Sequence, residues 1–347
     1  MSSAIAEGSG YTIVENASLA GRNTFRVAAR AEILIDVRRH EALTELFGFA
    51  ALKSRPLLVL GEGSNILFTR DWPGIVLSIA TRGIAIAESD GERAHIRVEA
   101  GENWNDFVHW SLAQGFAGLE NLVAIPGTVG AAPMQNIGAY GAEVREFVRG
   151  VHVWDRAESR HATLANADCG FAYRDSLFKR TPDRYVITAV DFELPRRREL
   201  RLDYAGVREE LSAMGVTEPR PATAAEAITR IRMRKLPNPQ VIGNAGSFFK
   251  NPLITQEAAN HLRREHPAAP VWAAADGLSK VSAAWLVEAC GFKGLREGDA
   301  GVSNQHALVL VNYGGASGAV VRALAERIRA GVRERFGIEL EPEPLIV

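Results

Sequence analysis

The sequence predicts a mixed fold of the α/β or α+β class, built from two or three compact units. Strand-like and helix-like runs occur throughout the 347 residues, and no self-similar repeat or low-complexity tract interrupts them. Gly and Pro punctuate these runs about every 20 to 30 residues. A chain of this length is long for one domain, so units that share a cleft are expected.

The predicted strands are apolar, β-branched runs bounded by turn residues. In chain order they cover 31–37, 56–61, 74–79, 94–101 and 185–194. The predicted helices carry apolar residues at a spacing of three to four. They cover 103–114, 224–235, 283–289 and 318–336. In the last of them, Val321, Leu324 and Ile328 form an apolar face and the arginines lie mostly elsewhere, which predicts a docking helix with a solvated basic side.

A change of composition near Met233–Gln240 predicts a boundary between units. Pro237 and Pro239 cannot continue the preceding helix, so the chain has to turn there. A separate C-terminal unit can begin just before the small-residue segment 243–252. We therefore expect Ser247, in that segment, to face a cleft between units.

Composition excludes several classes of protein. The chain is 47% hydrophobic and 23% charged, as in soluble globular proteins. Its 40 basic and 41 acidic residues give a net charge of -1, so no global field attracts nucleic acid or a membrane surface. Cys169 and Cys290 lack disulfide or metal-ligand spacing, and no metal site is expected. Without a leader or a long apolar run, a cytoplasmic protein is predicted.

Ser247 stands in the segment GNAGSFFKNP, among residues that leave the backbone bare. Gly243, Ala245 and Gly246 allow close approach to a bound ring or alkene. No histidine lies within ten residues on either side, so the local sequence offers the serine no base. This weakens a hydrolase interpretation and favours a serine that donates a proton.

The segment Leu58–Phe68 resembles the glycine-rich turn of a dinucleotide site but departs from it. Ile66 stands where the third glycine of GxGxxG belongs, and the following residues predict a strand instead of a helix. A turn of this kind can present consecutive N–H groups to a diphosphate. It can equally be a tight hairpin, and the segment alone does not decide between them.

A second small-residue segment, Asn121–Val144, favours the first interpretation. It holds four glycines between Gly127 and Gly141, together with alanines and amide side chains. Such a loop can lie flat against a large planar ligand. Two glycine-rich loops that each follow an apolar strand fit a nucleotide cofactor better than two unrelated turns.

Six segments in order resemble the UDP-N-acetylenolpyruvoylglucosamine reductase family, in its longer form with a tyrosine loop. The resemblance runs from about Asn23 to the C-terminus. The segments are 61–65, 125–144, 169–179, 233–237, 243–252 and 340–344.

The resemblance implies an α+β protein with an FAD-binding fold of the vanillyl-alcohol-oxidase type. It implies an FAD subdomain at 1–85, a second with the tyrosine loop at 86–235, and a C-terminal α/β substrate-binding domain at 236–347. In the family, NADPH reduces FAD, which passes hydride to UDP-N-acetylglucosamine enolpyruvate and yields UDP-N-acetylmuramate for peptidoglycan. We expect a monomer whose partner is this small-molecule substrate.

The resemblance also implies the site residues. The catalytic positions fall on Arg174, Ser247 and Glu343. The substrate-binding positions fall on Tyr204, Arg232, Lys235, Asn251 and Lys293. The FAD positions fall on Gly61, Glu62, Gly63, Ser64, Asn65, Ile125, Pro126, Gly127, Gly130, Asn136, Gly138 and Ala139.

Reaction chemistry agrees with these assignments. Hydride delivery to the terminal alkene carbon leaves negative charge on the adjacent carbon and its carboxylate, so cations and a proton donor are needed there. Arg174, Lys235 and Ser247 supply both. Taken alone, Arg174 could instead pair with Asp175. The short C-terminus also leaves the choice between Glu341 and Glu343 open.

Three further alternatives stay open at this stage. Tyr204 could be an ordinary edge-strand residue and no lid. The glycine loops would also serve an FAD-dependent oxidase of alcohols or hydroxy acids on the same fold, or a non-catalytic flavin- or nucleotide-sugar-binding protein. No motif for a second dinucleotide site is visible, so NADPH and substrate are expected to use one cleft in turn.

Overall fold

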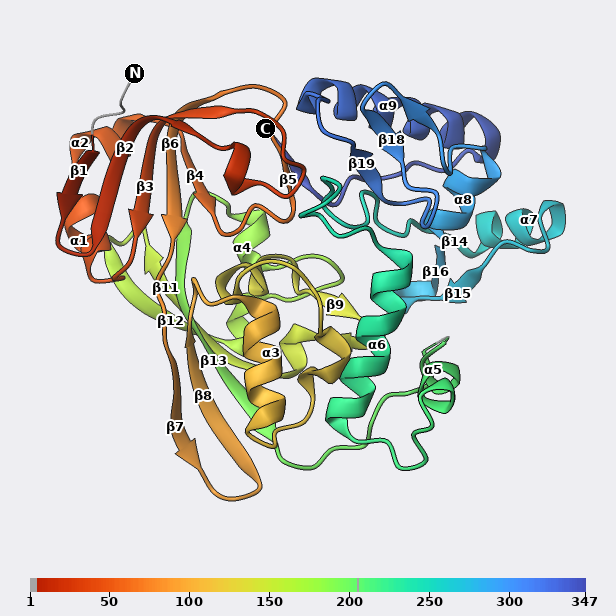
Figure 1. The fold of residues 1–347 in the computed structure, drawn as a ribbon, viewed down its shortest axis with the longest axis horizontal. Coiled ribbons are helices and arrows are strands. Elements are labelled where there is room, and N and C mark those ends of the chain that lie inside the picture. The colour runs from red at the N-terminus through yellow and green to blue at the C-terminus, as the bar shows by residue number, and fades with distance from the viewer. Residues whose placement is uncertain (1–4, 205) are drawn as a thin grey trace. The chain divides into compact units, whose positions relative to one another are not determined.

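The computed structural model describes residues 5–204 and 206–347 (Figure 1). The chain divides into two compact units. Of the described residues, the first comprises 5–17, 31–62, 72–204 and 206–232, and the second comprises 18–30, 63–71 and 233–347.

The first unit begins with a five-stranded sheet in the order β1-β2-β3-β6-β4. Strands β3, β6 and β4 are parallel, so their carboxyl ends lie along one edge. Two short helices, α1 (Ala42–Leu46) and α2 (Ala50–Ser54), connect β3 to β4. The strands are β1 (Ile5–Gly8), β2 (Tyr11–Ser18), β3 (Arg30–Val37), β4 (Leu57–Leu60) and β6 (Trp72–Ile79).

A second, antiparallel sheet of the same unit has the order β12-β11-β13-β8-β7. One face is apolar, and Phe192 of this sheet packs against Phe107 of helix α3 (Trp104–Ala113) at 4.8 Å between ring centroids. Figure 1 shows α3 on that side of β8 and β13. The strands are β7 (Ile84–Ser89), β8 (Arg93–Glu99), β11 (Val148–Asp155), β12 (Arg160–Ala165) and β13 (Tyr185–Pro195).

Helix α3 (Trp104–Ala113) begins where its sequence predicts. Asn103 is the N-cap, and its side-chain oxygen accepts from Asp106 N at 3.0 Å. The indole of Trp104 donates to Leu122 O at 2.8 Å, so the first turn is fixed to the segment that follows the helix.

The remaining elements of the first unit are short except for α6 (Pro221–Lys235), whose last three residues belong to the second unit. They are η2 (Leu119–Leu122), η3 (Val129–Ala131), η4 (Pro133–Gln135), β9 (Gly138–Ala139), β10 (Ala142–Glu143), η5 (Val144–Glu146), η6 (Asn166–Cys169), α4 (Leu177–Arg180) and α5 (Val207–Ala213).

The second unit contains two three-stranded antiparallel sheets and a short parallel pair of β5 with β20. Its elements are η1 (Ala20–Arg22), β5 (Ile66–Leu67), β14 (Leu253–Thr255), α7 (Gln256–Glu265), β15 (Val271–Ala273), η7 (Ala275–Gly277), β16 (Leu278–Val281), α8 (Ala283–Ala289), β17 (Arg296–Glu297), β18 (Ala300–Val302), β19 (Leu310–Asn312), α9 (Gly318–Phe336) and β20 (Leu345–Ile346).

The structure confirms every strand and helix predicted above, with ends shifted by up to three residues. Helix α6 starts at Pro221 and not at 224, because proline suits the first turn of a helix. As predicted, the buried face of α9 includes Val321, Leu324 and Ile328. Of the strands in the two five-stranded sheets, β1, β2, β7, β11 and β12 were not predicted. In the part of the chain that the structure describes, no helix is long and apolar enough to cross a membrane.

Candidate active site

The first glycine loop, 61–65, follows β4 and leads into strand β5, as the sequence predicts. A Cβ on Gly61 would lie 2.6 Å from Thr128 Oγ1. Gly63 has φ +67, and a Cβ there would clash with the carbonyl of Arg22. Both positions therefore require glycine, because of close approach at the first and backbone conformation at the second.

Glu62 of this loop is engaged within the protein. Its carboxylate accepts from Asn103 Nδ2 at 2.7 Å and from the backbone N of Gly127 at 3.2 Å. Glu62 thereby connects the end of β4 to the second glycine loop, 124–141.

The second loop lies against the sheet of β8 and β13. Gly130 N donates to Ala100 O at 2.9 Å, and a Cβ on Gly130 would lie 2.5 Å from that of Ala100. Asn136 is buried in the left-handed region, with φ +45. Its side-chain nitrogen donates to Glu143 and to Ala172 O, and its oxygen accepts from Arg145 N. The Asn136 side chain therefore holds the loop together.

These two loops fit a dinucleotide cofactor. Gly61, Gly63 and Gly127 carry no side chains, and the loops pass so close to Thr128 and Arg22 of the protein itself that a Cβ at Gly61 or Gly63 would clash; Gly127 has φ +120. Main-chain N–H groups in such loops can meet a diphosphate. The residues present thus agree with FAD.

Arg174 and Arg232 lie near the second loop. Arg174 has φ +54 and donates to Gly138 O at 2.8 Å. Arg232 donates from Nε to Ala124 O at 3.2 Å. Burial lowers the pKa of Arg232, and the charge of Arg174 lowers it further. Two neighbouring guanidinium groups favour an anionic ligand here.

Asp175 belongs to a different interaction. Its carboxylate forms an ion pair with Arg180, which lies at the end of α4. This pair weakens the simple interpretation of Arg174 as the ion-pair partner of Asp175.

Tyr204 packs against Tyr140 of the second glycine loop. Its ring centroid lies 4.9 Å from that of Tyr140, and its side chain remains about half exposed. Burial raises the pKa of Tyr140. The first unit thus brings together three of its predicted site residues, Arg174, Tyr204 and Arg232, around the second loop.

In the second unit, Ser247 lies on a central extended segment. Ser247 forms a β-bridge with Val309 on one side, and Phe248 N donates to Leu308 O at 2.8 Å. On the other side, Glu343 N donates to Phe248 O at 2.8 Å. The backbone therefore places Ser247 and Glu343 on adjacent paired segments.

Glu341 and Glu343 differ in their surroundings. The exposed Glu341 carboxylate forms an ion pair with Lys250, whose N donates to Glu341 O at 3.0 Å. The backbone carbonyl of Glu343 accepts from Asn65 Nδ2 at 3.3 Å. Glu343 is thus joined to both the serine segment and the first glycine loop within this unit.

A histidine that the sequence analysis missed lies in this unit. His306 Nδ1 accepts from Leu308 N at 3.2 Å. Burial lowers the pKa of His306, and the charges of Lys235 and Lys293 lower it further. No local pattern marks this residue, because pairing of the 308–309 segment with the serine segment is a long-range contact.

Two other predicted substrate residues have contacts of their own. Lys293 pairs with Glu288 at 3.0 Å. Asn251 Oδ1 accepts from Ala283 N at the start of α8, at 2.9 Å. Asn251 therefore fixes a helix end as well as being a candidate ligand residue.

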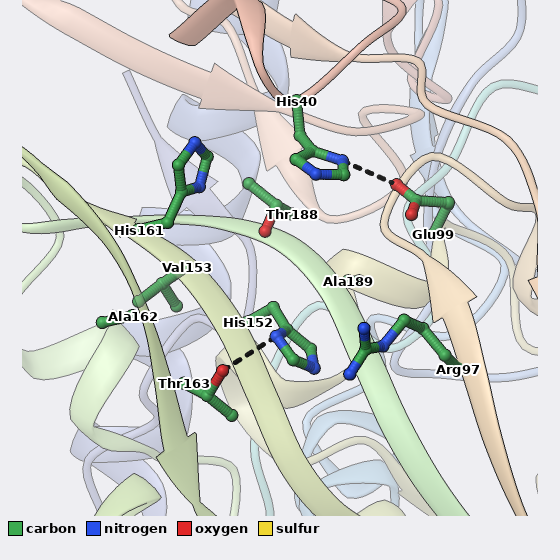
Figure 2. A pocket seen from close by; sticks show the side chains of 10 residues that line it. All are labelled: His40, Arg97, Glu99, His152, Val153, His161, Ala162, Thr163, Thr188 and Ala189. Atoms are coloured by element: carbon green, nitrogen blue, oxygen red, sulfur yellow. Dashed lines mark hydrogen bonds and ion pairs between the residues drawn. The ribbon is translucent and has the colours of Figure 1, made fainter. Parts of the chain in front are cut away.

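A polar cavity of about 340 Å³ lies on the other face of the second sheet (Figure 2). His152 Nε2 donates to Asp191 at 2.7 Å, and its Nδ1 is hydrogen-bonded to Thr163 Oγ1 at 2.9 Å. Arg97 Nε also donates to Asp191, at 2.9 Å. His40 lies 3.6 Å from Glu99. The cavity is lined by β8, β11, β12 and β13 and the segment after β3, whereas the predicted site residues lie on other segments.

The parallel and antiparallel sheets with two glycine loops define an FAD-dependent oxidoreductase of the vanillyl-alcohol-oxidase fold. A family model described as FAD binding domain matches residues 31–164. A model described as UDP-N-acetylenolpyruvoylglucosamine reductase, C-terminal domain, matches residues 238–347.

Relatives match nearly the whole chain. A UDP-N-acetylenolpyruvoylglucosamine reductase of Xanthomonas oryzae pv. oryzae is 52% identical over 339 residues, covering 97% of each chain. The protein of that name from Xylella fastidiosa (strain M12) is 50% identical, covering 96% of this chain and 95% of its own. The chain belongs to the UDP-N-acetylenolpyruvoylglucosamine reductase family.

A solved structure agrees on the fold. The crystal structure of UDP-N-acetylenolpyruvylglucosamine reductase from Thermus caldophilus matches with a TM-score of 0.68 at 24% identity, covering 99% of both chains. The fold predicted from the resemblance is confirmed. The oxidase and non-catalytic alternatives are not favoured, because the relatives at about 50% identity are named reductases.

Proposed function

We propose that this protein reduces UDP-N-acetylglucosamine enolpyruvate to UDP-N-acetylmuramate in peptidoglycan precursor synthesis, with NADPH as reductant and FAD as cofactor. The observation that carries the proposal is the 52% identity to a reductase of that name over 97% of the chain. The paired serine segment and the two glycine loops supply the chemistry that this reaction needs.

FAD, when bound, takes hydride from NADPH and supplies it to the methylene carbon of the substrate. Ser247 donates the proton to the adjacent carbon, so one hydride and one proton saturate the double bond. Arg174 and Lys235 stabilise the negative charge that develops on that carbon and its carboxylate. Glu343 orients Ser247 or a water molecule, and the ion pair of Glu341 with Lys250 supports this choice over Glu341.

We assign FAD to the two glycine loops. The contacts to it are assigned to Gly61, Gly63, Ser64, Asn65, Ile125, Pro126, Gly127, Gly130, Gly138 and Ala139. Glu62 and Asn136 support these loops through hydrogen bonds within the protein.

We assign substrate binding to Tyr204, Arg232, Lys235, Asn251 and Lys293. Tyr204 serves as the lid over the diphosphate, and the cations meet its charge. The division of the chain at 85 and 235 into two FAD subdomains and a substrate domain is part of the proposal. We also propose that the protein is a cytoplasmic monomer that binds neither nucleic acid nor membrane. NADPH and substrate bind to it in turn.

The test is an anaerobic half-reaction of the purified flavoprotein. NADPH first reduces the flavin, UDP-N-acetylglucosamine enolpyruvate is then added, and the visible flavin absorbance follows each step. We expect substrate to restore the oxidised spectrum in the wild type. Ser247→Ala should keep the first step and slow the second by about 10²- to 10⁴-fold.

Ser54→Ala is the matched control, because this serine is exposed at the end of α2. It should behave as the wild type in both steps. Restoration by oxygen alone would contradict the reductase proposal. A normal second step in Ser247→Ala would leave the reductase in place and remove the serine from the proton transfer.

A further inference from the structure

The carboxylate of Glu62 is the only acidic group of the first glycine loop. A negative charge beside a loop that binds a diphosphate opposes binding. Its presence needs a physical reason, and the hydrogen bonds of Glu62 supply one.

Both carboxylate oxygens of Glu62, an exposed residue, accept hydrogen bonds, one from a half-buried side chain and one from a buried backbone N–H. Oε2 accepts from the backbone N of Gly127, a buried residue of the second glycine loop. A buried N–H without an acceptor is destabilising. Oε1 accepts from Asn103 Nδ2 at 2.7 Å, a short and charge-assisted bond.

Asn103 is already fixed by the start of α3. Its Oδ1 caps the helix through Asp106 N, so its amide nitrogen must point away from the helix. Its backbone forms a β-bridge with Thr128, and Trp104 N donates to Gly127 O at 2.9 Å. The contacts between the start of α3 and the second glycine loop therefore do not depend on Glu62.

We infer that Glu62 and Asn103 form a clamp that sets the distance between the two FAD-binding loops, and that Glu62 is a positioning residue and not a ligand of the cofactor. The inference rests on the proposed FAD site. All three residues, Glu62, Asn103 and Gly127, belong to the first unit. The N-terminus of α3 also offsets part of the Glu62 charge.

The clamp and simple charge repulsion predict opposite results for Glu62→Gln. This variant removes the charge, so repulsion alone predicts tighter binding of FAD. The clamp predicts weaker binding, because the glutamine amide faces two donors and its nitrogen cannot accept from either. We expect the dissociation constant of FAD to rise by about tenfold or more.

The decisive variant exchanges the two functional groups by combining Glu62→Gln with Asn103→Asp. The introduced glutamine can then accept from Gly127 N and donate to the introduced aspartate, which still caps α3. The net charge is that of the wild type. We expect Asn103→Asp alone to weaken binding, because two carboxylates would face each other, and the double variant to bind within about threefold of the wild type.

The measurement is titration of deflavinated full-length protein with FAD, together with hydrogen exchange of the Gly127 amide in the same apoproteins. Exchange should be faster in Glu62→Gln and slow again in the double variant. Asp106→Asn is the control, because it removes an exposed carboxylate from the same helix end and keeps both clamp side chains and the backbone N of residue 106 that Asn103 caps.

Two results would overturn the inference: wild-type or tighter FAD binding by Glu62→Gln, or a double variant that binds no better than the single ones. Binding of FAD by the wild type is measured first. If the wild type did not bind FAD, the proposed cofactor site itself would be contradicted. Failure of the cofactor site is thereby distinguished from failure of the clamp.

Discussion

At the residue scale, unusual backbone conformations concentrate in the segments that the motifs singled out. Among the residues that the structure describes, eight non-glycine residues have positive φ. Four of them, Ala124, Asn136, Tyr140 and Arg174, lie in two of the six motif segments or directly beside one of them. Such conformations cost about 1–3 kcal/mol each and persist where surrounding contacts enforce them. The hydrogen bonds of Asn136 and Arg174 provide that enforcement.

Tyr204→Phe tests the lid assignment at this scale. Phenylalanine keeps the ring contact with Tyr140 but loses the hydroxyl that we assign to the substrate diphosphate. Steady-state kinetics should show a higher KM for UDP-N-acetylglucosamine enolpyruvate, by about tenfold, which corresponds to about 1.4 kcal/mol. Reduction by NADPH should be unchanged. An unaltered substrate affinity would show that the Tyr204 hydroxyl does not contribute to substrate binding.

The two C-terminal glutamates offer a paired test. Glu343→Gln should slow substrate-dependent reoxidation of the flavin by about 10²-fold or more, because the proposed role of Glu343 is to orient the proton donor. Glu341→Gln should leave this rate unchanged and lower stability by about 1 kcal/mol, since it weakens an ion pair in which Glu341 is exposed and Lys250 is largely buried. The reverse pattern, measured by the same half-reaction, would shift the assignment to Glu341.

The residues that were predictable and those that were not differ in the range of their contacts. Ser247 and the glycines of the two loops are visible in local sequence, because small residues must stand together for close approach. The local sequence around Asn103 predicts only a helix cap, and its bond to Glu62 joins remote segments. His306 lacks a local signal for the same reason. Spacing therefore indicated the glycine-rich backbone that we assign to the cofactor, but not the side chains whose hydrogen bonds hold the loops in place.

At the element scale, long apolar runs were predictable and short pairings were not. Strands β3, β6 and β13 carry continuous apolar residues that only a buried sheet explains. Strand β12, with the sequence RHATLA, has no continuous apolar run, and the pair β5 and β20 has two residues in each strand. Such short or polar strands exist because a partner segment accepts their hydrogen bonds, and the partner is not visible locally.

Helix α9 gives the prediction at this scale. An alanine in place of glycine usually stabilises a helix by about 1 kcal/mol. At Gly318, the first residue of α9, an added Cβ would clash with the carbonyl of Phe68. Gly318→Ala should therefore lower the free energy of unfolding by at least about 1 kcal/mol.

The matched control for Gly318→Ala is Gly21→Ala, in the short helix η1. A Cβ at Gly21 would meet no atom within 4 Å, and this residue belongs to the same unit. Chemical unfolding of both variants measures the difference. A Gly318→Ala protein as stable as the wild type would mean that the start of α9 moves away from Phe68 at little cost.

At the scale of the whole molecule, the net charge of -1 is the sum of 40 basic and 41 acidic residues, many of which form local ion pairs. Burial opposes ionisation of Asp191, but hydrogen bonds from His152 and Arg97 hold its pKa well below the usual range. Hydrogen bonds from Arg201 and Arg198 likewise outweigh burial and lower the pKa of Glu146. Stability at neutral pH therefore depends on carboxylates that are ionised and paired.

Two histidines add a second pH dependence. Burial lowers the pKa of His161, and nearby His40 lowers it further. The pKa of His306 is lowered by burial and by two lysines. Below about pH 6.5, histidines of the unfolded chain bind protons that these two still exclude in the folded state. Their contribution is therefore complete above that pH and is lost as the pH falls toward their folded pKa values.

The free energy of unfolding of the FAD-saturated protein should accordingly fall in two stages on acidification. The first lies below about pH 6.5 and comes from His161 and His306, and the second lies below about pH 4 and comes from Asp191 and Glu146. Urea unfolding across this range measures both. His161→Gln should reduce the first stage and leave the second, because glutamine does not titrate. A first stage of wild-type size in that variant would show that His161 is accessible to protons in the folded state.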